Sequence, residues 1–431
     1  MSKLAILGAR IIDPANRLDD IGDVLVEDGK IAGLGRAVFA DGLAEDIKTI
    51  DANGLILSPG LIDMRVVTGE PGAEHKETLA SAGIAAAAGG VTSMVVMPQT
   101  NPVIDDISLV DYIMRRGRET SPVKVYAAGA LTKGLNNTDM TELGMMAEAG
   151  AVMFSNGENA IADTQLMRRI MAYSSTFNAL IAHRAYDPYL SKGTCAHESE
   201  FASRRGLPAA PALSERIMAE RDMALVELTG ARYLLDMVSS AETLPAITRA
   251  KKRGLDVNVS VSINHLALNE LDIGDYRSFA KLDPPLRGED DRLALLAAVN
   301  DGTIDIIVSA HDPRPSGEKR RPFAESAAGA VGLELLLSAG LTLVADEQLD
   351  ILALLKAVTS NPADLLGLPQ GRLNIGAPAD LVLINPNTPW VCDADTLSSI
   401  SRNTPFDERK MQGKAVMTIC DGVVVFEDGV G

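Results

Sequence analysis

Residues 79–97 read LASAGIAAAAGGVTSMVVM, an alanine-rich segment that reaches a double glycine and then passes into an apolar run. Glycine commonly stands just past the end of a helix, so the pair at 89–90 predicts a helix C-cap rather than a phosphate-binding loop. The apolar run 92–97 is short and rich in β-branched residues, which indicates a buried strand. This stretch is therefore a helix followed by a strand, the repeating unit of an α/β fold.

The same alternation continues on both sides of this stretch. Amphipathic segments such as 164–174 and 214–228 separate short apolar runs. The strand candidates are 60–63, 92–97, 123–127, 151–154, 179–183, 233–237, 256–261 and 305–309. Eight such units predict a (β/α)8 TIM-type barrel, in which the chemistry lies at the C-terminal ends of the strands.

The two ends of the chain have a different pattern. Short strand-like runs lie near the N-terminus around turns at Asp13-Pro14 and Asp28-Gly29, and similar runs lie near the C-terminus around Asp421-Gly422. We expect both ends to build one small β-sandwich. The predicted domains are residues 1–57 and 371–431 for the two parts of the sandwich and 58–370 for the barrel.

Composition excludes several classes of partner. The chain has 431 residues and a formal net charge of −18, which argues against binding to nucleic acid or to an anionic membrane surface. We expect neither a signal peptide nor a membrane span, because no apolar run is long enough. Three widely spaced cysteines fit neither a disulfide scaffold nor a CxxC zinc site, so we expect a cytoplasmic protein.

Histidine is scarce, and its positions matter for any metal site. The chain has five histidines, His75, His183, His197, His265 and His311, and no two are spaced as a ligand pair. A histidine-rich metal site would need most of them from distant parts of the chain. His75 and His197 are expected on exposed loops or helices, and His265 in packing or polar contacts.

Several motifs at the predicted strand ends form a specific set. Over essentially its whole length the chain resembles the dihydroorotases of the amidohydrolase superfamily, of the bacterial long-chain type. That resemblance implies the reversible cyclisation of carbamoyl aspartate to dihydroorotate by zinc-activated water. The motifs that carry it are 58–63 (SPGLID), 70–72 (EPG), 76–78 (KET), 89–92 (GGVT), 97–102 (MPQTNP), 129–134 (GALTKG), 284–287 (PPLR), 301–305 (DGTID) and 401–407 (SRNTPFD).

The resemblance also implies a His-x-His pair of zinc ligands at the end of the first barrel strand. Arg65 and Val67 stand at those positions. A permanent cation at position 65 opposes a bound dication, although it can take over the electrostatic role of the metal by pairing with a remaining acid. The family's substrate-binding arginine is replaced by Gly69, while its substrate-binding asparagine is retained as Asn101.

The remaining site positions show the same loss. The resemblance places a bridging carboxylate at Asn156, a histidine ligand at Met237 and the general-base aspartate at Ala310, and none of these residues can do that work. His183 alone keeps a metal-ligand position, and His311 keeps a substrate position. One imidazole cannot hold zinc, so a hydrogen-bonded histidine at the barrel mouth is the simpler interpretation of His183.

Motifs that shape the barrel persist while those that hold metal are lost. We interpret the chain as a dihydroorotase-like pseudoenzyme of pyrimidine biosynthesis that binds no metal cofactor. The resemblance implies a non-catalytic subunit that supports the aspartate transcarbamoylase catalytic subunit in a homo- or hetero-oligomer.

Two alternatives stay open. One is an active cyclic-amide hydrolase, a zinc-dependent dihydroorotase with a rebuilt site of His183, His311 and Asp312. The other is a sensor that binds an anionic pyrimidine intermediate through Arg65, Asn101 and His311.

Overall fold

A closed ring of parallel strands forms the centre of the molecule. The computed structural model describes residues 3–40, 42–43 and 47–429, and its barrel sheet has the order β15-β14-β13-β10-β9-β8-β7-β6. Val66 and His311 form a parallel bridge in which the Val67 amide donates to the His311 carbonyl at 2.8 Å, and this contact joins the last strand to the first. The barrel predicted from the sequence is confirmed.

The barrel strands are short and almost entirely buried. The first of them runs to Val66, three residues beyond the predicted end, and so carries Arg65 within the sheet. The strands are β6 (Leu61–Val66), β7 (Val91–Val96), β8 (Lys124–Ala130), β9 (Ala151–Ser155), β10 (Leu180–His183), β13 (Arg232–Leu235), β14 (Val257–Ser262) and β15 (Ile306–Val308).

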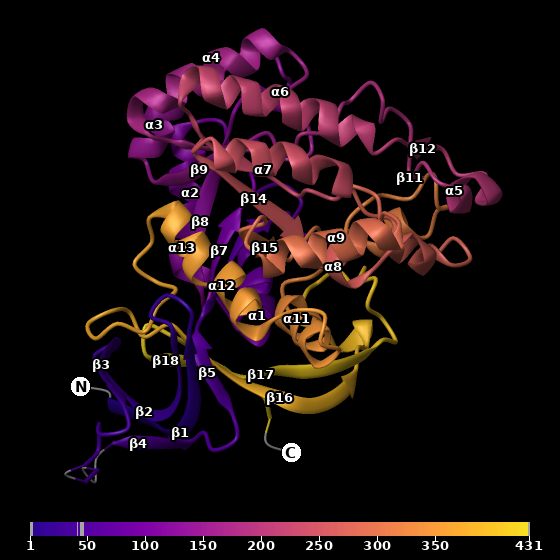
Figure 1. The fold of residues 1–431 in the computed structure, drawn as a ribbon. Coiled ribbons are helices and arrows are strands. Elements are labelled where there is room, and N and C mark those ends of the chain that lie inside the picture. Colours follow the sequence, from indigo (N-terminus) through magenta and orange to yellow (C-terminus); the bar gives the residue numbers. More distant parts are fainter. Residues whose placement is uncertain (1–2, 41, 44–46, 430–431) are drawn as a thin grey trace.

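Helices surround these strands (Figure 1). The first begins at Thr78, whose side chain forms a capping box with Ser81, and it ends at Gly89 as the sequence predicts. The larger helices are α1 (Leu79–Ala88), α2 (Ile107–Thr120), α4 (Thr164–Ser174), α6 (Leu213–Thr229), α7 (Leu244–Lys252), α9 (Glu289–Asn300), α11 (Leu336–Ala345), α12 (Ile351–Val358) and α13 (Ser360–Leu366).

Shorter elements complete the connections. They are α3 (Leu143–Glu148), α5 (Glu200–Arg205), α8 (Ile263–Ala267), α10 (Ser316–Lys319), β11 (Ala196–His197), β12 (Ala209–Ala210), η1 (Lys133–Leu135), η2 (Ser175–Phe177), η3 (Ala241–Thr243), η4 (Glu270–Ile273), η5 (Ser278–Ala280) and η6 (Ala394–Thr396). Within the described residues, no helix combines the length and the apolar character that crossing a membrane requires.

Strands from both ends of the chain share a second sheet of order β18-β17-β16-β5-β1-β2-β3, with β4 beside β1 (Figure 1). Its strands are β1 (Lys3–Asp13), β2 (Leu18–Glu27), β3 (Lys30–Gly35), β4 (Lys48–Asp51), β5 (Ile56–Pro59), β16 (Leu381–Val391), β17 (Lys410–Cys420) and β18 (Val423–Glu427). The antiparallel pairing of β5 with β16 joins the two ends. It builds the small β domain that the sequence predicts; the domain boundaries stay predictions.

A lysine holds the barrel and this sheet together. The Lys124 ammonium at the start of β8 donates to Asp380 at 2.6 Å and to Asp421 at 2.7 Å. Asp380 is only 1% exposed, and burial raises the pKa of its carboxyl although Lys124 counteracts the rise. The lysine therefore compensates a buried negative charge at the domain junction.

We expect Lys124→Met to lower the free energy of unfolding by about 3 kcal/mol at pH 7, because it leaves Asp380 buried without a counter-charge. Urea titration followed by circular dichroism measures the loss. Lys414→Met is the matched control, since the Lys414–Asp428 pair on the same sheet is much more exposed. Equal losses in the two variants would contradict this role of Lys124.

Candidate site at the mouth of the barrel

A buried ion pair occupies the centre of the barrel mouth. Arg65 on β6 and Asp236, just after β13, are each 4% exposed, and the guanidinium donates to Asp236 Oδ2 at 2.7 Å. The other oxygen of Asp236 accepts from the Ser260 hydroxyl on β14 at 2.8 Å. These two contacts to Asp236 therefore join the ends of three barrel strands, β6, β13 and β14. The sequence indicates that Arg65 can pair with an acid but does not show which one. In the structure this acid is Asp236.

His183, the one retained ligand position, has both ring nitrogens engaged. Its Nδ1 lies 2.7 Å from Asp222 on α6, and its Nε2 accepts from the Ile161 amide at 2.9 Å. A nitrogen that accepts from an amide carries no proton, so this geometry requires the neutral ring with its proton on Nδ1. No lone pair remains for a metal.

Asp222 is fixed by more than the histidine. It also accepts from the Tyr233 hydroxyl at 2.6 Å and from Arg221 at 2.8 Å. Burial alone would raise the pKa of Asp222, but His183, Arg221 and Tyr233 together hold that pKa below its usual value. His183 is thus part of a closed hydrogen-bond network, in agreement with the simpler of the two interpretations.

Asn156 stands after β9, where a bridging carboxylate was implied, and it acts as a cross-link between loops. Its side-chain oxygen accepts from the Thr132 amide at 3.0 Å. Its amide nitrogen donates to the Thr132 hydroxyl at 2.8 Å and to Asn137 at 2.7 Å. Every polar atom of the side chain is satisfied within the protein.

Met237 and Ala310 have left-handed backbones, with φ of 60° and 52°. Neither residue type favours this region, and such strain is typically found at functional sites. The Met237 amide is held by the Ser260 hydroxyl at 2.9 Å. The main chain at these two positions therefore keeps an unusual geometry although the side chains carry no catalytic group.

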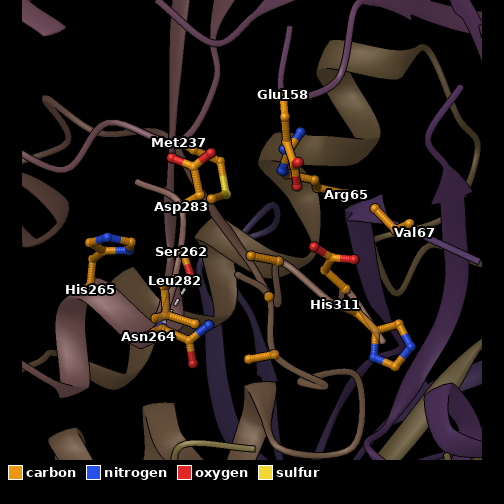
Figure 2. A pocket seen from close by; sticks show the side chains of 14 residues that line it. Arg65, Val67, Glu158, Met237, Ser262, Asn264, His265, Leu282, Asp283 and His311 are labelled. Carbon is orange, nitrogen blue, oxygen red and sulfur yellow. Dashed lines mark hydrogen bonds between the residues drawn. The ribbon is translucent and has the colours of Figure 1, made fainter. Parts of the chain in front are cut away.

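The space around Arg65 is very small. The cavity at this point measures about 20 Å³, room for roughly one water molecule. Its lining includes Arg65, Val67, Met237, Ala310 and Asp312, and Figure 2 shows several of these side chains from close by. This cavity adjoins a larger rim pocket, with which it shares the lining residues Val67, Glu158 and Asp312.

His311 and Asn101, the two expected substrate residues, do not share a pocket. The His311 ring lies away from Arg65 and Met237 (Figure 2), with Nδ1 accepting from the Gly332 amide at 3.2 Å and Nε2 3.5 Å from Glu77. Asn101 lines a separate rim pocket of about 260 Å³. His311 lines the adjoining cavity around Arg65, and the substrate role expected for these two residues stays a prediction.

Gly69 lies under a closely folded loop. The Gly69 amide donates to the Glu77 carbonyl at 2.8 Å, and its own carbonyl accepts from the Ala73 amide at 2.6 Å. A Cβ atom at this position would lie 1.9 Å from the Ala73 carbonyl oxygen. The loop has closed over the position where the resemblance places a substrate-binding arginine.

A second group of charged residues lies between the cavity and the rim. Asp312 accepts from Arg314 at 2.7 Å, and burial, followed by the nearby Glu158, raises the pKa of Asp312 to about 7. Lys319 is 1% exposed and donates to the Ala327 carbonyl at 2.8 Å. Burial lowers the pKa of this lysine to about 7.

Sequence reasoning missed four of these functional neighbours, Asp222, Asp236, Glu158 and Lys319. Asp236 had one usable signal, because it stands directly before the altered ligand position Met237. Asp222 lies on a helix 39 residues from His183, and no sequence spacing predicts that contact.

The residues at the mouth do not fit zinc. A zinc site needs several free imidazole, thiolate or carboxylate atoms around one point, whereas here His183 is fully engaged and Arg65 supplies a fixed cation. In the described part of the chain, one group of three potential ligands comes together, Asp380, Cys420 and Asp421. That group lies at the domain junction, and Lys124 already binds both of its carboxylates.

Comparison with known proteins gives a consistent result. A family model described as dihydro-orotase-like matches residues 54–243, and an amidohydrolase family model matches residues 329–426. The dihydroorotase of Syntrophus aciditrophicus is 38% identical, over 99% of this chain and 100% of that protein. A dihydroorotase-like protein of Pseudomonas aeruginosa is 37% identical, over 98% of this chain and 99% of that one.

Solved structures share the fold. The L-hydantoinase (dihydropyrimidinase) of Arthrobacter aurescens superposes with a TM-score of 0.89 at 24% identity, over 100% of this chain and 97% of that chain. The dihydropyrimidinase of Brevibacillus agri superposes with a TM-score of 0.84 at 20% identity, over 99% and 95%. At this level of identity the likeness concerns the fold alone.

We expect Arg65→Met to lower the free energy of unfolding by about 3–5 kcal/mol, because it leaves the Asp236 carboxylate buried without a cation. Arg65→Met combined with Asp236→Asn should lose clearly less than the sum of the two single variants, since the amide oxygen still accepts from Ser260. Denaturant titration of this double-mutant cycle measures the coupling.

Arg204→Met, in an exposed pair with Glu200, is the control and should lower the free energy of unfolding by less than about 1 kcal/mol. Additive losses would show that Arg65 and Asp236 do not depend on each other.

Lys319 should make stability depend on pH. Between its ordinary pKa of 10.5 and the lowered pKa of about 7, the unfolded chain binds a proton that the folded lysine does not, so folding weakens as the pH falls through this range. Lys319→Met removes this penalty. The free energy of unfolding of the variant should exceed that of the native chain at pH 7. This difference should be larger at pH 7 than at pH 10 by on the order of 3 kcal/mol. Thermal or urea unfolding at both pH values tests this, with exposed Lys252→Met as the control. A difference between variant and native chain that does not change with pH would contradict it.

Proposed function

This chain belongs to the dihydroorotase family of amidohydrolases, and from that membership we propose that it is a non-catalytic member of the family. The observation that carries the proposal is the buried Arg65–Asp236 ion pair, with its 2.7 Å contact, at the position of the first zinc ligand. A fixed cation at that point repels a metal dication, and His183, the one retained ligand position, has no free nitrogen.

The base that the family reaction requires is missing as well. Ala310 has no proton-accepting group at the position implied for the general base. Asp312, two residues further along, is held by Arg314, and its raised pKa reflects burial and the neighbouring Glu158. Most residues of the mouth therefore bind one another and fix the strand ends, and the position implied for the general base carries no carboxylate.

For its biological role, we propose a scaffold subunit in pyrimidine biosynthesis in the cytoplasm. The partner is the aspartate transcarbamoylase catalytic subunit, and the support for it is the family resemblance together with a complete barrel whose mouth holds the Arg65–Asp236 ion pair. In this role the outer surface of the fold, rather than the barrel mouth, carries the function.

The active-hydrolase alternative needs His183, His311 and Asp312 around one reacting centre. His183 is closed off by Asp222 and Ile161, and His311 faces Glu77. Of these three residues, His311 and Asp312 line the cavity around Arg65, whereas His183 is not among its lining residues.

The sensor alternative has one observation in its favour, the rim pocket of about 260 Å³ that contains Asn101. Three buried polar atoms that have no partner belong to side chains lining it, namely Gln99 Oε1, Asp312 Oδ1 and Arg314 Nε. Acceptors and a donor side by side suit an amide or ureido group. Arg65 is not available for this ligand, because it is paired with Asp236.

The decisive experiment measures metal content and dihydroorotate turnover in the same purified sample, beside the dihydroorotase of Syntrophus aciditrophicus. We expect less than stoichiometric zinc and no turnover above background. His183→Ala should change stability and leave that background unchanged. Turnover comparable with that of the Syntrophus enzyme, abolished by His183→Ala, would overturn the proposal in favour of the rebuilt hydrolase.

Two further measurements on the same sample separate the other roles. Co-purification with the aspartate transcarbamoylase catalytic subunit of the same organism should give a stable complex on size-exclusion chromatography, and separate elution at micromolar concentration would remove the scaffold role. A thermal shift with millimolar dihydroorotate or carbamoyl aspartate that Asn101→Ala abolishes would support the sensor instead.

A further inference from the structure

A large pocket lies at the end of the barrel opposite the mouth. It measures about 480 Å³, within the range of small-molecule sites. Its walls come from the β1–β2 hairpin of the β domain, from the connection between α9 and β15, and from α12. The pocket therefore joins the two domains and shares no lining residue with the cavity around Arg65.

One side of this pocket is apolar. Leu18 comes from the hairpin, Val299 from α9, Ile304 from the α9–β15 connection and Leu352 from α12. Val299 and Ile304 are almost fully buried, whereas Leu352 is 39% exposed. Such a surface can take up the hydrocarbon part of a small molecule.

The acids that line the pocket already have partners. Each accepts from another group of the protein: Asp19 from Arg10 at 2.8 Å, Asp301 from the Thr303 amide at 2.8 Å, Asp305 from Lys251 at 2.6 Å and Asp350 from the Ala353 amide at 2.9 Å. The two asparagine side chains that line the pocket also have partners. The Asn300 side chain donates to the Gln348 carbonyl, and the Asn361 side chain donates to the Asp305 carbonyl.

The cations that line the pocket differ from the acids. Across the described residues, neither the Arg17 guanidinium nor the Lys356 ammonium has a hydrogen-bond or ion-pair partner. Arg17 stands at the turn of the hairpin with a left-handed backbone, φ 53°, which an arginine rarely adopts. The donors of these two cations are therefore free to bind a ligand, while Lys356 also counteracts the burial-driven rise in the pKa of Asp305.

We propose that this pocket binds a small organic anion, with a phosphate or carboxylate group held by Arg17 and Lys356 and an apolar body against Leu18 and Leu352. The two cations come from different domains, so one ligand contacts both the hairpin and α12. Inorganic anions fill only part of such a volume, which favours an organic ligand. The inference goes beyond the proposed function and does not depend on it.

Fluorine NMR on the full chain tests the proposal with 4-fluorophenyl phosphate and 4-fluorobenzoate as probes and neutral 4-fluorobenzyl alcohol as the comparator. We expect at least one of the two anions to bind at millimolar concentration or below, and the better one to identify the head group. Arg17→Gln and Lys356→Gln should each weaken binding about fivefold, and added salt should weaken it further.

The matched control is Lys252→Gln, which removes one exposed cation from α7 and should leave binding unchanged. Arg17 and Lys356 are exposed and unpaired, so their variants should keep the native circular dichroism spectrum and melting temperature. Binding of the neutral alcohol as tight as that of the anions would overturn the proposal. So would anion binding that survives the Arg17→Gln/Lys356→Gln double variant, or no binding of either anion at 10 mM.

Discussion

The architecture depends on how a barrel satisfies the polar groups that converge at the carboxyl ends of its strands. Those ends bring buried carboxylates such as Asp63 and Asp236 into a space with almost no water. A buried negative charge needs a cation within hydrogen-bond distance or it must take up a proton. Here the guanidinium of Arg65 meets this need for Asp236, while burial raises the pKa of Asp63 to about 6.

A guanidinium differs from a metal ion in what it allows. It is planar, it is held by its own side chain, and it presents donors but accepts no ligand. A metal would keep an open position for water and substrate, whereas the Arg65 contact leaves a cavity for roughly one water molecule. Under the proposed non-catalytic role, the residue that keeps the strand ends together is also the one that occupies the place of the reaction centre.

The fold was accessible from the sequence because each barrel unit carries its own local signal. The run at 92–97 and the glycines at 89–90 predict a strand and a helix end without knowledge of the rest of the chain. Only part of the site could be predicted from the sequence. The altered positions Arg65, Val67, Asn156, Met237 and Ala310 were visible, but the partners that stabilise them come from elsewhere in the chain. The direction of the His311 ring depends on the left-handed turn at Ala310 and on Glu77, which no local pattern encodes.

The closed loop over Gly69 bears on the history of the chain. At most surface positions a lost side chain can return by a single substitution, and selection can then act on it. Here any side chain would collide with the Ala73 carbonyl, so an arginine could return only after the segment around residue 73 had moved. The main chain occupies the volume that a side chain would need, so a single substitution at this position cannot supply the arginine that the resemblance places there.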